Sequence, residues 1–537
     1  MTVILLLFCS ASAFAQSDAT VKGKVIDESG EPIIGANIKE KNSSGGVISD
    51  LDGNYVLKVK DLQHAVLQVS FVGYTSIEEP VKGRSKVDIQ LVSSVVNLGE
   101  VVAIGYGTQT RREITGSVAN VSEENFNKGV NRDASDLLQG KVAGLSIISG
   151  SGDVTRSSQI RLRGTSTLQN DQGPMIVIDG VPGGDMSTVS PSDIASISVL
   201  KDASSAAIYG SRAAGGVILI TTKRGSGSKK VVAYDGYVTA SVVANKPDML
   251  NAAEWRQANK ELGNNTSEFD KYNSDTDWFG EMLRTGVSQN HSLSLSGGSS
   301  NSNYRASYTY LDRTGIARDN YMKRHSFRFQ FQQRAINDRL RIGLTGSTSL
   351  TDMRMPFADD FIIAYTMPPV YPVYNADGSY FTEANHNYDQ GNPVQNQDQN
   401  YRKSENIYFY GQGDLQFEIM EGLTTKVNLY KSRFSNDYRE WLDPQNTRGQ
   451  GDNGKAVRQA RTWNRELLEW TGNYIKELGD DNEHKIDAII GYSWENNIYA
   501  DQRSESTNFA VSSMGADNIQ AGNTLKIGNV TFQPQRL

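Results

Sequence analysis

The chain has 537 residues, enough for several domains, and a formal net charge of −7 at pH 7. Acidic and basic residues are interspersed, so no basic face favours nucleic-acid binding. The single cysteine, Cys9, lies in the first apolar run, and without that run the mature chain has no thiol, no disulfide and no cysteine-based metal site.

Residues 1–15 have the pattern of a secretory signal peptide. An apolar run, Val3 to Phe8, precedes the small-x-small site Ala13-Phe14-Ala15, which predicts cleavage after Ala15. A positive n-region is missing, so the true start is expected upstream. A lipoprotein signal at Cys9 is the weaker alternative. No other stretch reaches the roughly 18 apolar residues of a transmembrane helix, so any membrane crossing must use strands.

Residues 20–92 consist of short alternating runs separated by turn residues at regular spacing. This pattern predicts a small β-sandwich. Asp50-Leu51-Asp52-Gly53-Asn54 has some features of a calcium loop, but glycine stands fourth and the twelfth residue is Asp61 instead of glutamate. A hairpin turn is therefore the favoured interpretation. Residues 98–109 follow as a short β-prone run bounded by glycines.

Residues 110–225 are dense in glycine and in short β-type runs. Gln159–Gly164 reads QIRLRG, Pro174–Pro182 reads PMIVIDGVP, and an Ala-rich, helix-prone turn leads through glycines into a buried strand at Val217–Lys223. A phosphate-binding loop at Gly210–Gly216 is the alternative, but the G-x-x-x-x-G-K-[ST] pattern is absent. The motif residues are Arg161, Arg163, Gly164, Asp179, Gly180, Lys201, Asp202, Tyr209, Gly210, Arg212, Gly215 and Gly216.

This series of motifs resembles the plug domain of TonB-dependent outer-membrane transporters, and most closely the SusC/RagA group. The resemblance implies a mixed α/β plug lodged inside a large β-barrel. Residues 20–92 are similar to the carboxypeptidase-regulatory-like domain that many members carry in the periplasm, which has no hydrolytic residues. The plug arginines Arg161, Arg163 and Arg212 are expected to pair with carboxylates of the plug or barrel wall, since enclosed charges need partners.

Residues 98–109 match the family's TonB box region. The coupling residues implied are Glu100, Val101, Val102, Ala103, Ile104, Gly105 and Tyr106. Such a segment can add as a strand to a TonB-type energising complex through main-chain hydrogen bonds. An ordinary first strand of the plug is the alternative.

Residues 229–537 form a long series of alternating strands, typical of a transmembrane barrel with a lipid face and a wet lumen. Examples are Tyr304–Tyr310, Phe327–Phe331, Leu340–Leu344, Leu423–Leu429 and Ile486–Tyr492. The same alternation also occurs in soluble sandwiches. Trp441, Trp463, Trp470 and Trp494 are candidates for interfacial girdles.

The segments between these strands differ in length. Leu311–Gly315 and Ala335–Asp338 are expected to be tight turns, whereas 246–287, with a helix at Ala252–Glu261, and 353–404 are long. Long loops are where such transporters contact their cargo. Aromatic candidates for stacking on sugar rings are Tyr371, Tyr374, Tyr380, Tyr388 and Tyr401.

Catalytic and metal-binding patterns are missing. The five histidines are scattered without H-E-x-x-H spacing, no G-x-S-x-G elbow is present, and no carboxylate pair stands out as an acid/base couple. We therefore expect no enzyme activity, no cofactor and no metal.

The predicted fold is mainly β: an N-terminal β-sandwich, a mixed α/β plug and an antiparallel transmembrane β-barrel. The resemblance implies import of oligosaccharide or peptide nutrients across the outer membrane, with a SusD-like surface lipoprotein, the TonB-type complex and outer-membrane lipid as partners. A receptor or adhesin that binds without transport is the alternative. Since plugged transporters have about 22 strands and roughly ten are counted to Asn497, the chain is expected to be an incomplete barrel.

Overall fold

The computed structural model describes residues 19–536 except for 28–29, 42, 44, 51, 72–73, 75, 92–100, 105–106, 111–116, 130, 132, 149–151, 165–172, 203–205, 226–229, 268, 300, 383–390, 479–483, 512 and 514. The expected signal peptide lies outside the described residues. The chain divides into two compact units, the first holding strands β1–β7 and the second the elements from β10 to β26.

The first unit is the β-sandwich that the alternating runs predict. Its strands are β1 (Ala19–Ile26), β2 (Asn37–Glu40), β3 (Gly46–Ile48), β4 (Asn54–Val59), β5 (Val66–Ser70), β6 (Ile77–Pro80) and β7 (Ile89–Gln90). One sheet has the order β4-β1-β7 and the other β3-β2-β5-β6. Alternate residues such as Val21, Val25, Leu57 and Val69 point between the sheets and form the buried core.

The Asp50 segment is a turn, as favoured over a calcium loop. The Asp50 carboxylate accepts hydrogen bonds from the backbone N–H of Asp52 (3.0 Å) and of Asn54 (2.8 Å), and Gly53 has a φ of 78°. The hydrogen bond from Asn54 lowers the pKa of Asp50. Across the described ranges, no group of three or more His, Cys, Asp or Glu side chains is arranged to hold a metal ion.

The segment that resembles a TonB box contains two short strands. β8 (Val101–Ile104) and β9 (Gly107–Thr110) form a two-stranded sheet of their own. Neither strand joins the plug sheet among the described residues, which disfavours the alternative that β8 is an ordinary first plug strand. Glu100, Gly105 and Tyr106 lie outside the described residues.

The plug is a five-stranded mixed sheet with the order β10-β15-β16-β13-β14. Its strands are β10 (Val118–Ser122), β13 (Met175–Ile178), β14 (Val181–Pro182), β15 (Ile194–Leu200) and β16 (Val217–Thr222). A separate hairpin joins β11 (Leu145–Ile148) to β12 (Gln159–Leu162). Short 3-10 helices connect these strands: η1 (Glu123–Asn125), η2 (Asp136–Leu138), η3 (Met186–Thr188), η4 (Pro191–Asp193) and η5 (Ala207–Ala213).

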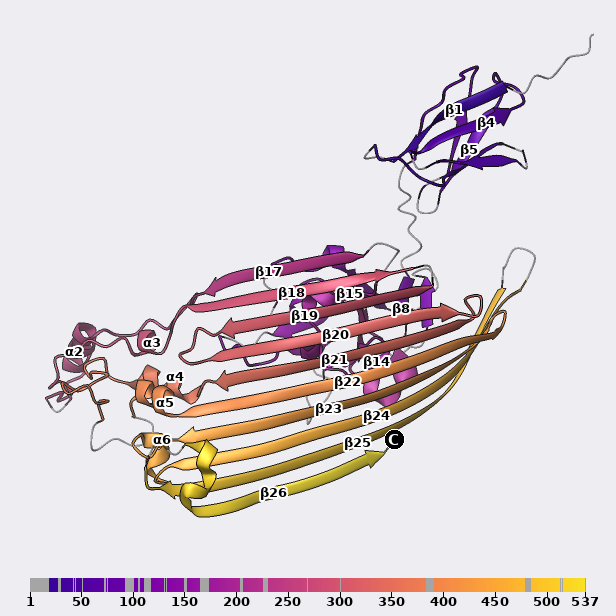
Figure 1. Ribbon diagram of the computed structural model, residues 1–537. Coiled ribbons are helices and arrows are strands. Elements are labelled where there is room, and N and C mark those ends of the chain that lie inside the picture. Colours follow the sequence, from indigo (N-terminus) through magenta and orange to yellow (C-terminus); the bar gives the residue numbers. More distant parts are fainter. Residues whose placement is uncertain are drawn as a thin grey trace, which may run out of the picture. The chain divides into compact units, whose positions relative to one another are not determined.

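The second unit also contains a ten-stranded antiparallel sheet in which every strand pairs with its neighbour in the chain. It comprises β17 (Val231–Ser241), β18 (Gly286–Gly298), β19 (Ser302–Thr314), β20 (Tyr321–Ala335), β21 (Leu340–Met355), β22 (Tyr401–Met420), β23 (Leu423–Leu442), β24 (Lys455–Leu478), β25 (His484–Phe509) and β26 (Gly522–Arg536). The sheet curves around the plug (Figure 1). The tenth strand, β26, lies beyond Asn497, although roughly ten strands were expected before that residue.

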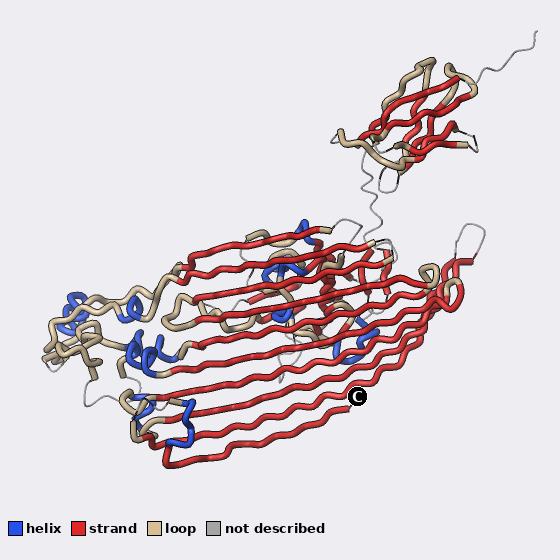
Figure 2. Tube along the Cα trace, viewed as in Figure 1, coloured by secondary structure: helices blue, strands red, loops and turns tan. Residues whose placement is uncertain are grey.

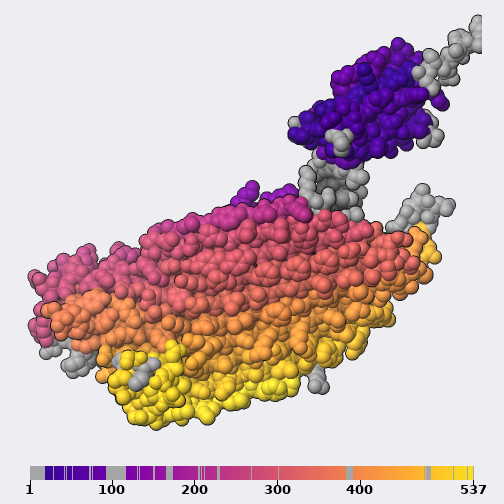
Figure 3. Space-filling model, in the orientation of Figure 1, coloured from indigo at the N-terminus to yellow at the C-terminus, as the bar shows by residue number. Residues whose placement is uncertain are grey.

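Side chains alternate between the two faces of this sheet, as predicted. On β20, Phe327 is 48% exposed on the convex face, whereas its neighbour Arg328 is 6% exposed and contacts the plug. The outer face forms one continuous surface across the strands (Figure 3). Large exposed apolar side chains such as Leu344, Phe409 and Ile490 lie on it. This apolar face suits a lipid environment.

Connections at one end of the strands are long and carry the helices, whereas those at the other end are short (Figures 1 and 2). The helices are α2 (Ala252–Glu261), α3 (Trp278–Glu281), α4 (Asp359–Thr366), α5 (Pro393–Gln399), α6 (Thr447–Gln450) and the 3-10 helix η8 (Ala516–Ala521). The helix expected at Ala252–Glu261 is confirmed, and Asn251 and Glu254 form its capping box. Within the described ranges, no helix has the length and apolar character needed to cross a membrane.

The structure contradicts the expectations for Leu311–Gly315 and for Trp441. Leu311 to Thr314 continue β19 instead of forming a tight turn, because they pair with Met322, Lys323 and their neighbours on β20. Trp441 is only 2% exposed, since it packs edge-to-face on Phe509 at the helix-bearing end instead of facing lipid. By contrast, the turn at Ala335–Asp338 is confirmed by positive φ angles at residues 336–338.

The plug motif glycines make a testable stability prediction. Gly216 has a φ of 88°, and a Cβ there would lie 2.3 Å from Leu162 Cδ2 and 3.0 Å from the Leu200 carbonyl oxygen. We expect Gly216→Ala to lower the free energy of unfolding of the plug by about 1–3 kcal/mol more than Gly164→Ala, because overpacking adds to backbone strain. Gly164 is the matched control, with a φ of 93° and nothing within 4 Å of an added Cβ. Equal losses in denaturant unfolding would contradict this packing.

Candidate functional site

The boundary between the plug and the concave face of the sheet begins at the Asp179-Gly180 turn, which joins β13 to β14. Both residues have positive φ angles, 49° and 87°. The Asp179 carboxylate faces β16, where it accepts hydrogen bonds from the Thr222 backbone N–H (2.9 Å) and hydroxyl (2.8 Å). The turn of the PMIVIDGVP motif is therefore fixed to the neighbouring plug strand.

The same carboxylate pairs with the wall. The Arg328 guanidinium on β20 donates one hydrogen bond to Asp179 and another to the Tyr410 hydroxyl on β22. Both charged side chains are buried, with 7% of Arg328 and 6% of Asp179 exposed. Such a pair tolerates burial only while both charges are present. One plug motif is thus locked to two wall strands.

A second buried pair lies further along the plug. Asp193, in η4 between β14 and β15, accepts a hydrogen bond from Arg305 of β19 at 2.9 Å and another from the Ser307 hydroxyl at 2.7 Å. The Ser192 hydroxyl also lies 2.9 Å from that of Ser292 on β18. Sequence reasoning missed Asp193, because nothing in the local pattern separates it from an ordinary turn aspartate.

Arg212 forms the ion pair with a carboxylate that the sequence analysis expects. Its guanidinium lies 2.8 Å from Glu495 on β25, and Arg465 of β24 pairs with the same carboxylate at 2.9 Å. Arg465 also donates to the Pro182 carbonyl oxygen of the plug. Arg212 remains 46% exposed, so this contact is more solvated than that of Asp179.

The other motif residues take structural positions. Arg161 lies on β12 opposite Ser146, and Arg163 follows that strand with a φ of 58° and an exposed side chain. Lys201 and Asp202 follow β15, and Asp202 accepts a hydrogen bond from the Ser117 backbone N–H. Other places are as follows: Tyr209 is buried in η5, Gly210 is the kink of η5, and Gly215 and Gly216 precede β16.

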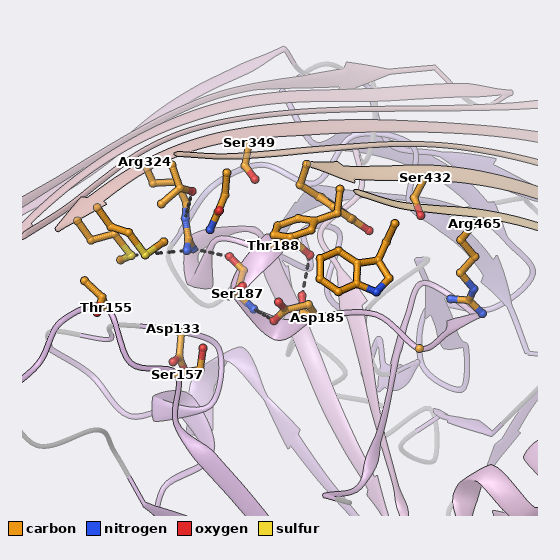
Figure 4. A pocket seen from close by; sticks show the side chains of 18 of the residues that line it. Asp133, Thr155, Ser157, Asp185, Ser187, Thr188, Arg324, Ser349, Ser432 and Arg465 are labelled. Atoms are coloured by element: carbon orange, nitrogen blue, oxygen red, sulfur yellow. Dashed lines mark hydrogen bonds between the residues drawn. The ribbon is translucent and has the colours of Figure 1, made fainter. Parts of the chain in front are cut away.

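A cavity of about 580 Å³ lies between the plug and the wall (Figure 4). The plug contributes residues 154–157 and the η3 region, including Asp185 and Ser187, while the wall contributes inward-facing side chains of β19 to β26. Its aromatic lining consists of Tyr408, Tyr430, Phe434, Trp463 and Tyr499. The volume falls within the range of about 300–1,000 Å³ that is usual for small-molecule sites.

The aromatic side chains that line this cavity differ from those expected in the long loops. Tyr371 is fully buried in a cluster around α4, and the Tyr401 hydroxyl accepts a hydrogen bond from the Ala516 backbone N–H at 2.9 Å. Tyr380 donates to Asp398 at 2.7 Å and Tyr374 is exposed, whereas Tyr388 lies outside the described residues. Trp463 was expected at the lipid interface but faces the cavity. It lies two residues before Arg465 on β24, so both side chains point to the face that contacts the plug.

Comparison with protein families gives two matches. Residues 110–217 match the TonB-dependent Receptor Plug Domain, and residues 21–103 match the CarboxypepD_reg-like domain. The chain is 37% identical over 387 residues to the TonB-dependent receptor SusC of Bacteroides thetaiotaomicron, across 70% of this chain and 38% of that protein. The chain belongs to the SusC/RagA family of TonB-dependent receptors.

Other similarities agree with this family. The TonB-dependent receptor P3 of Formosa agariphila is 30% identical over 550 residues, across 99% of this chain and 52% of that protein. The fold matches the structure of the RagAB peptide importer in its open-open state, with a TM-score of 0.69 and 24% identity over 81% of this chain and 53% of that one. The chain therefore spans about half the length of these relatives or less. Its family places it in the outer membrane.

The buried pair at the plug turn leads to a second prediction. Asp179→Asn keeps a residue type that tolerates positive φ but leaves Arg328 as an enclosed charge without its carboxylate. We expect it to destabilise the docked plug by about 3–5 kcal/mol, seen as faster amide hydrogen exchange in β13 and β16. Arg212→Gln is the matched control and should cost at most about 1 kcal/mol, since Glu495 keeps Arg465. Similar exchange in both variants would contradict the Asp179 lock.

Proposed function

We propose that the protein takes part in TonB-dependent import of an oligosaccharide or peptide nutrient across the outer membrane. The observation that carries the proposal is a plug fixed by buried ion pairs to the concave face of a sheet whose convex face is apolar. A blocked passage of this kind needs an energy source that moves the plug. The relatives compared are receptors and an importer, which favours a non-enzymatic role.

The cavity beside the plug supports a ligand route from outside the cell. Met322, Met353 and Asn406 line it and lie near the strand ends that join the long, helix-bearing connections. Barrels of this class carry their longer loops on the outer side. A ligand entering past these connections would meet plug residues 154–157 and the wall together, so that binding alters the plug.

The energy-coupling segment in this proposal is Glu100–Tyr106, which contains β8. A strand added to a partner transmits force through main-chain hydrogen bonds, and side chains matter little. The periplasmic sandwich of β1–β7 precedes this segment in the chain. A surface lipoprotein of the SusD type is proposed as the partner on the long-loop side, by analogy with the family.

If main-chain hydrogen bonds transmit the force, the effect of a substitution in β8 should depend on whether it removes a backbone N–H. Val102→Pro removes a backbone N–H and should abolish uptake, as should deletion of residues 100–106. Val102→Ala keeps the backbone and should retain most uptake. Uptake and surface binding of labelled ligand would be measured in cells that carry each variant at equal abundance.

Surface binding is the internal control of this experiment. Ligand should still bind to cells that carry Val102→Pro, because the segment is needed for pulling and not for recognition. Undiminished uptake by the proline variant and the deletion would exclude this segment as the coupling strand. Loss of both binding and uptake would indicate a misfolded plug instead of an uncoupled one, and would remove the support for the segment's role.

A further inference from the structure

Arg324 of β20 points into the cavity from the wall side (Figure 4). Its Nη1 donates to the Ser187 carbonyl oxygen of the plug, and its Nε donates to the Thr351 hydroxyl at 3.1 Å. Its Nη2 lies 3.7 Å from the Met322 sulfur, which is a weak acceptor. These partners are neutral, while the charges of Asp185 and Asp133 act on the guanidinium from beyond ion-pair distance.

Three other inward-facing arginines of the sheet have carboxylate partners. Arg305 pairs with Asp193, Arg328 with Asp179, and Arg465 with Glu495. Arg324 forms no ion pair with any carboxylate of the described residues. Since an enclosed charge is costly without a partner, a positive group kept at a cavity wall is suited to an anionic ligand.

The plug adds an arginine to the cavity, whose wall also carries Arg313 and Arg465. Arg156 lines it from the plug side and is exposed. The two acidic residues of the lining are engaged within the plug: Asp133 accepts from the Ser135 backbone N–H at 2.8 Å, and Asp185 accepts from the Ser187 backbone N–H at 2.8 Å. These carboxylates cap local turns and form no ion pair with Arg324, which keeps free N–H donors for a ligand although its charge is partly offset by theirs. Arg156 is exposed to the same space.

The remaining lining suits sugar rings. Trp463 packs between Phe434 and Tyr499 in tilted contacts, with ring centroids 5.4 Å and 4.6 Å away, and the three rings form an aromatic platform. Hydroxyl and amide side chains surround it, including those of Asn406, Ser432 and Asn497. A sugar presents an apolar C–H face to such a platform and hydroxyls to the amides around it.

We propose that the cavity binds an acidic oligosaccharide, whose carboxylate or sulfate group is held by Arg324 and Arg156 while a ring stacks on Trp463. This inference rests on the proposed import function and assigns its substrate class. Guanidinium groups bind planar carboxylates and tetrahedral oxyanions through paired hydrogen bonds. An anion that joins the plug arginine to the wall arginine would couple occupancy to the position of the plug.

The test measures binding to the purified full chain in detergent, read by calorimetry and by quenching of tryptophan fluorescence. The probes are trigalacturonate, a sulfated galactose trisaccharide, neutral galactotriose, and an acidic tripeptide with its amide. We expect an acidic sugar to bind at least tenfold more tightly than the neutral one. The carboxylated and sulfated probes distinguish the two oxyanions.

Substitutions locate the binding. Arg324→Gln should weaken acidic-sugar binding about 10- to 100-fold, because it removes one or two charge-assisted hydrogen bonds to the anion. The same substitution should leave neutral-sugar binding unchanged. Arg324→Lys should lose less, since it keeps the charge. Lys323→Gln is the matched control, because it removes a charge from the adjacent, outward-facing position of β20 and should have no effect. Heat-modifiable mobility and plug hydrogen exchange confirm that each variant is folded.

Three outcomes would overturn the inference: equal affinity for acidic and neutral sugars, no loss in Arg324→Gln while the chain is folded, or Arg324-dependent binding of the peptide carboxylate alone. The last would assign a peptide ligand to the same site. None of these results bears on import, which fails if cells that carry the unmodified chain take up no ligand, or on the coupling segment, which is excluded if uptake survives Val102→Pro. The two proposals can therefore fail separately.

Discussion

Charge enclosed between the plug and the sheet is the constraint on which the arrangement depends. Asp179 and Asp193 of the plug are buried against Arg328 and Arg305 of the wall, and removing either member of such a pair would leave an isolated charge. The plug is consequently held at one position and one rotation. Its apolar core, around Ile197 and Ile218, stabilises the plug itself but does not fix it to the wall.

The cavity follows from this docking. The ion pairs hold the plug sheet against β19 to β25, while the η3 region and residues 154–157 stand back from the wall and leave room on the side of the long connections. Arg328 is paired with Asp179 where the wall is docked on the plug, whereas the wall beside the cavity keeps aromatic rings and Arg324, which has no ion pair. Plug docking and ligand recognition thus use the same face of the same strands.

Local patterns predicted the fold but not its pairing. Alternation at Phe327–Phe331 gave the correct lipid and plug faces because its period of two follows from backbone geometry. The Asp179-Gly180 turn was also evident, since positive φ restricts residue choice. Arg328, the partner of Asp179, is 149 residues away in the chain. The face to which Trp463 points follows from its position two residues before Arg465, which contacts the plug. Such features depend on register across many strands, which no local pattern encodes.

The most direct test of this account is a reversible staple between plug and wall. Ser192 and Ser292 have hydroxyl oxygens 2.9 Å apart, so cysteines at both positions would bring their sulfur atoms close together, and the chain beyond Cys9 has no other thiol. If the docked plug must move for import, the oxidised Ser192→Cys/Ser292→Cys variant should bind ligand at the cell surface without importing it, and reduction should restore uptake. Import at the unmodified rate by the fully oxidised variant would contradict the central claim.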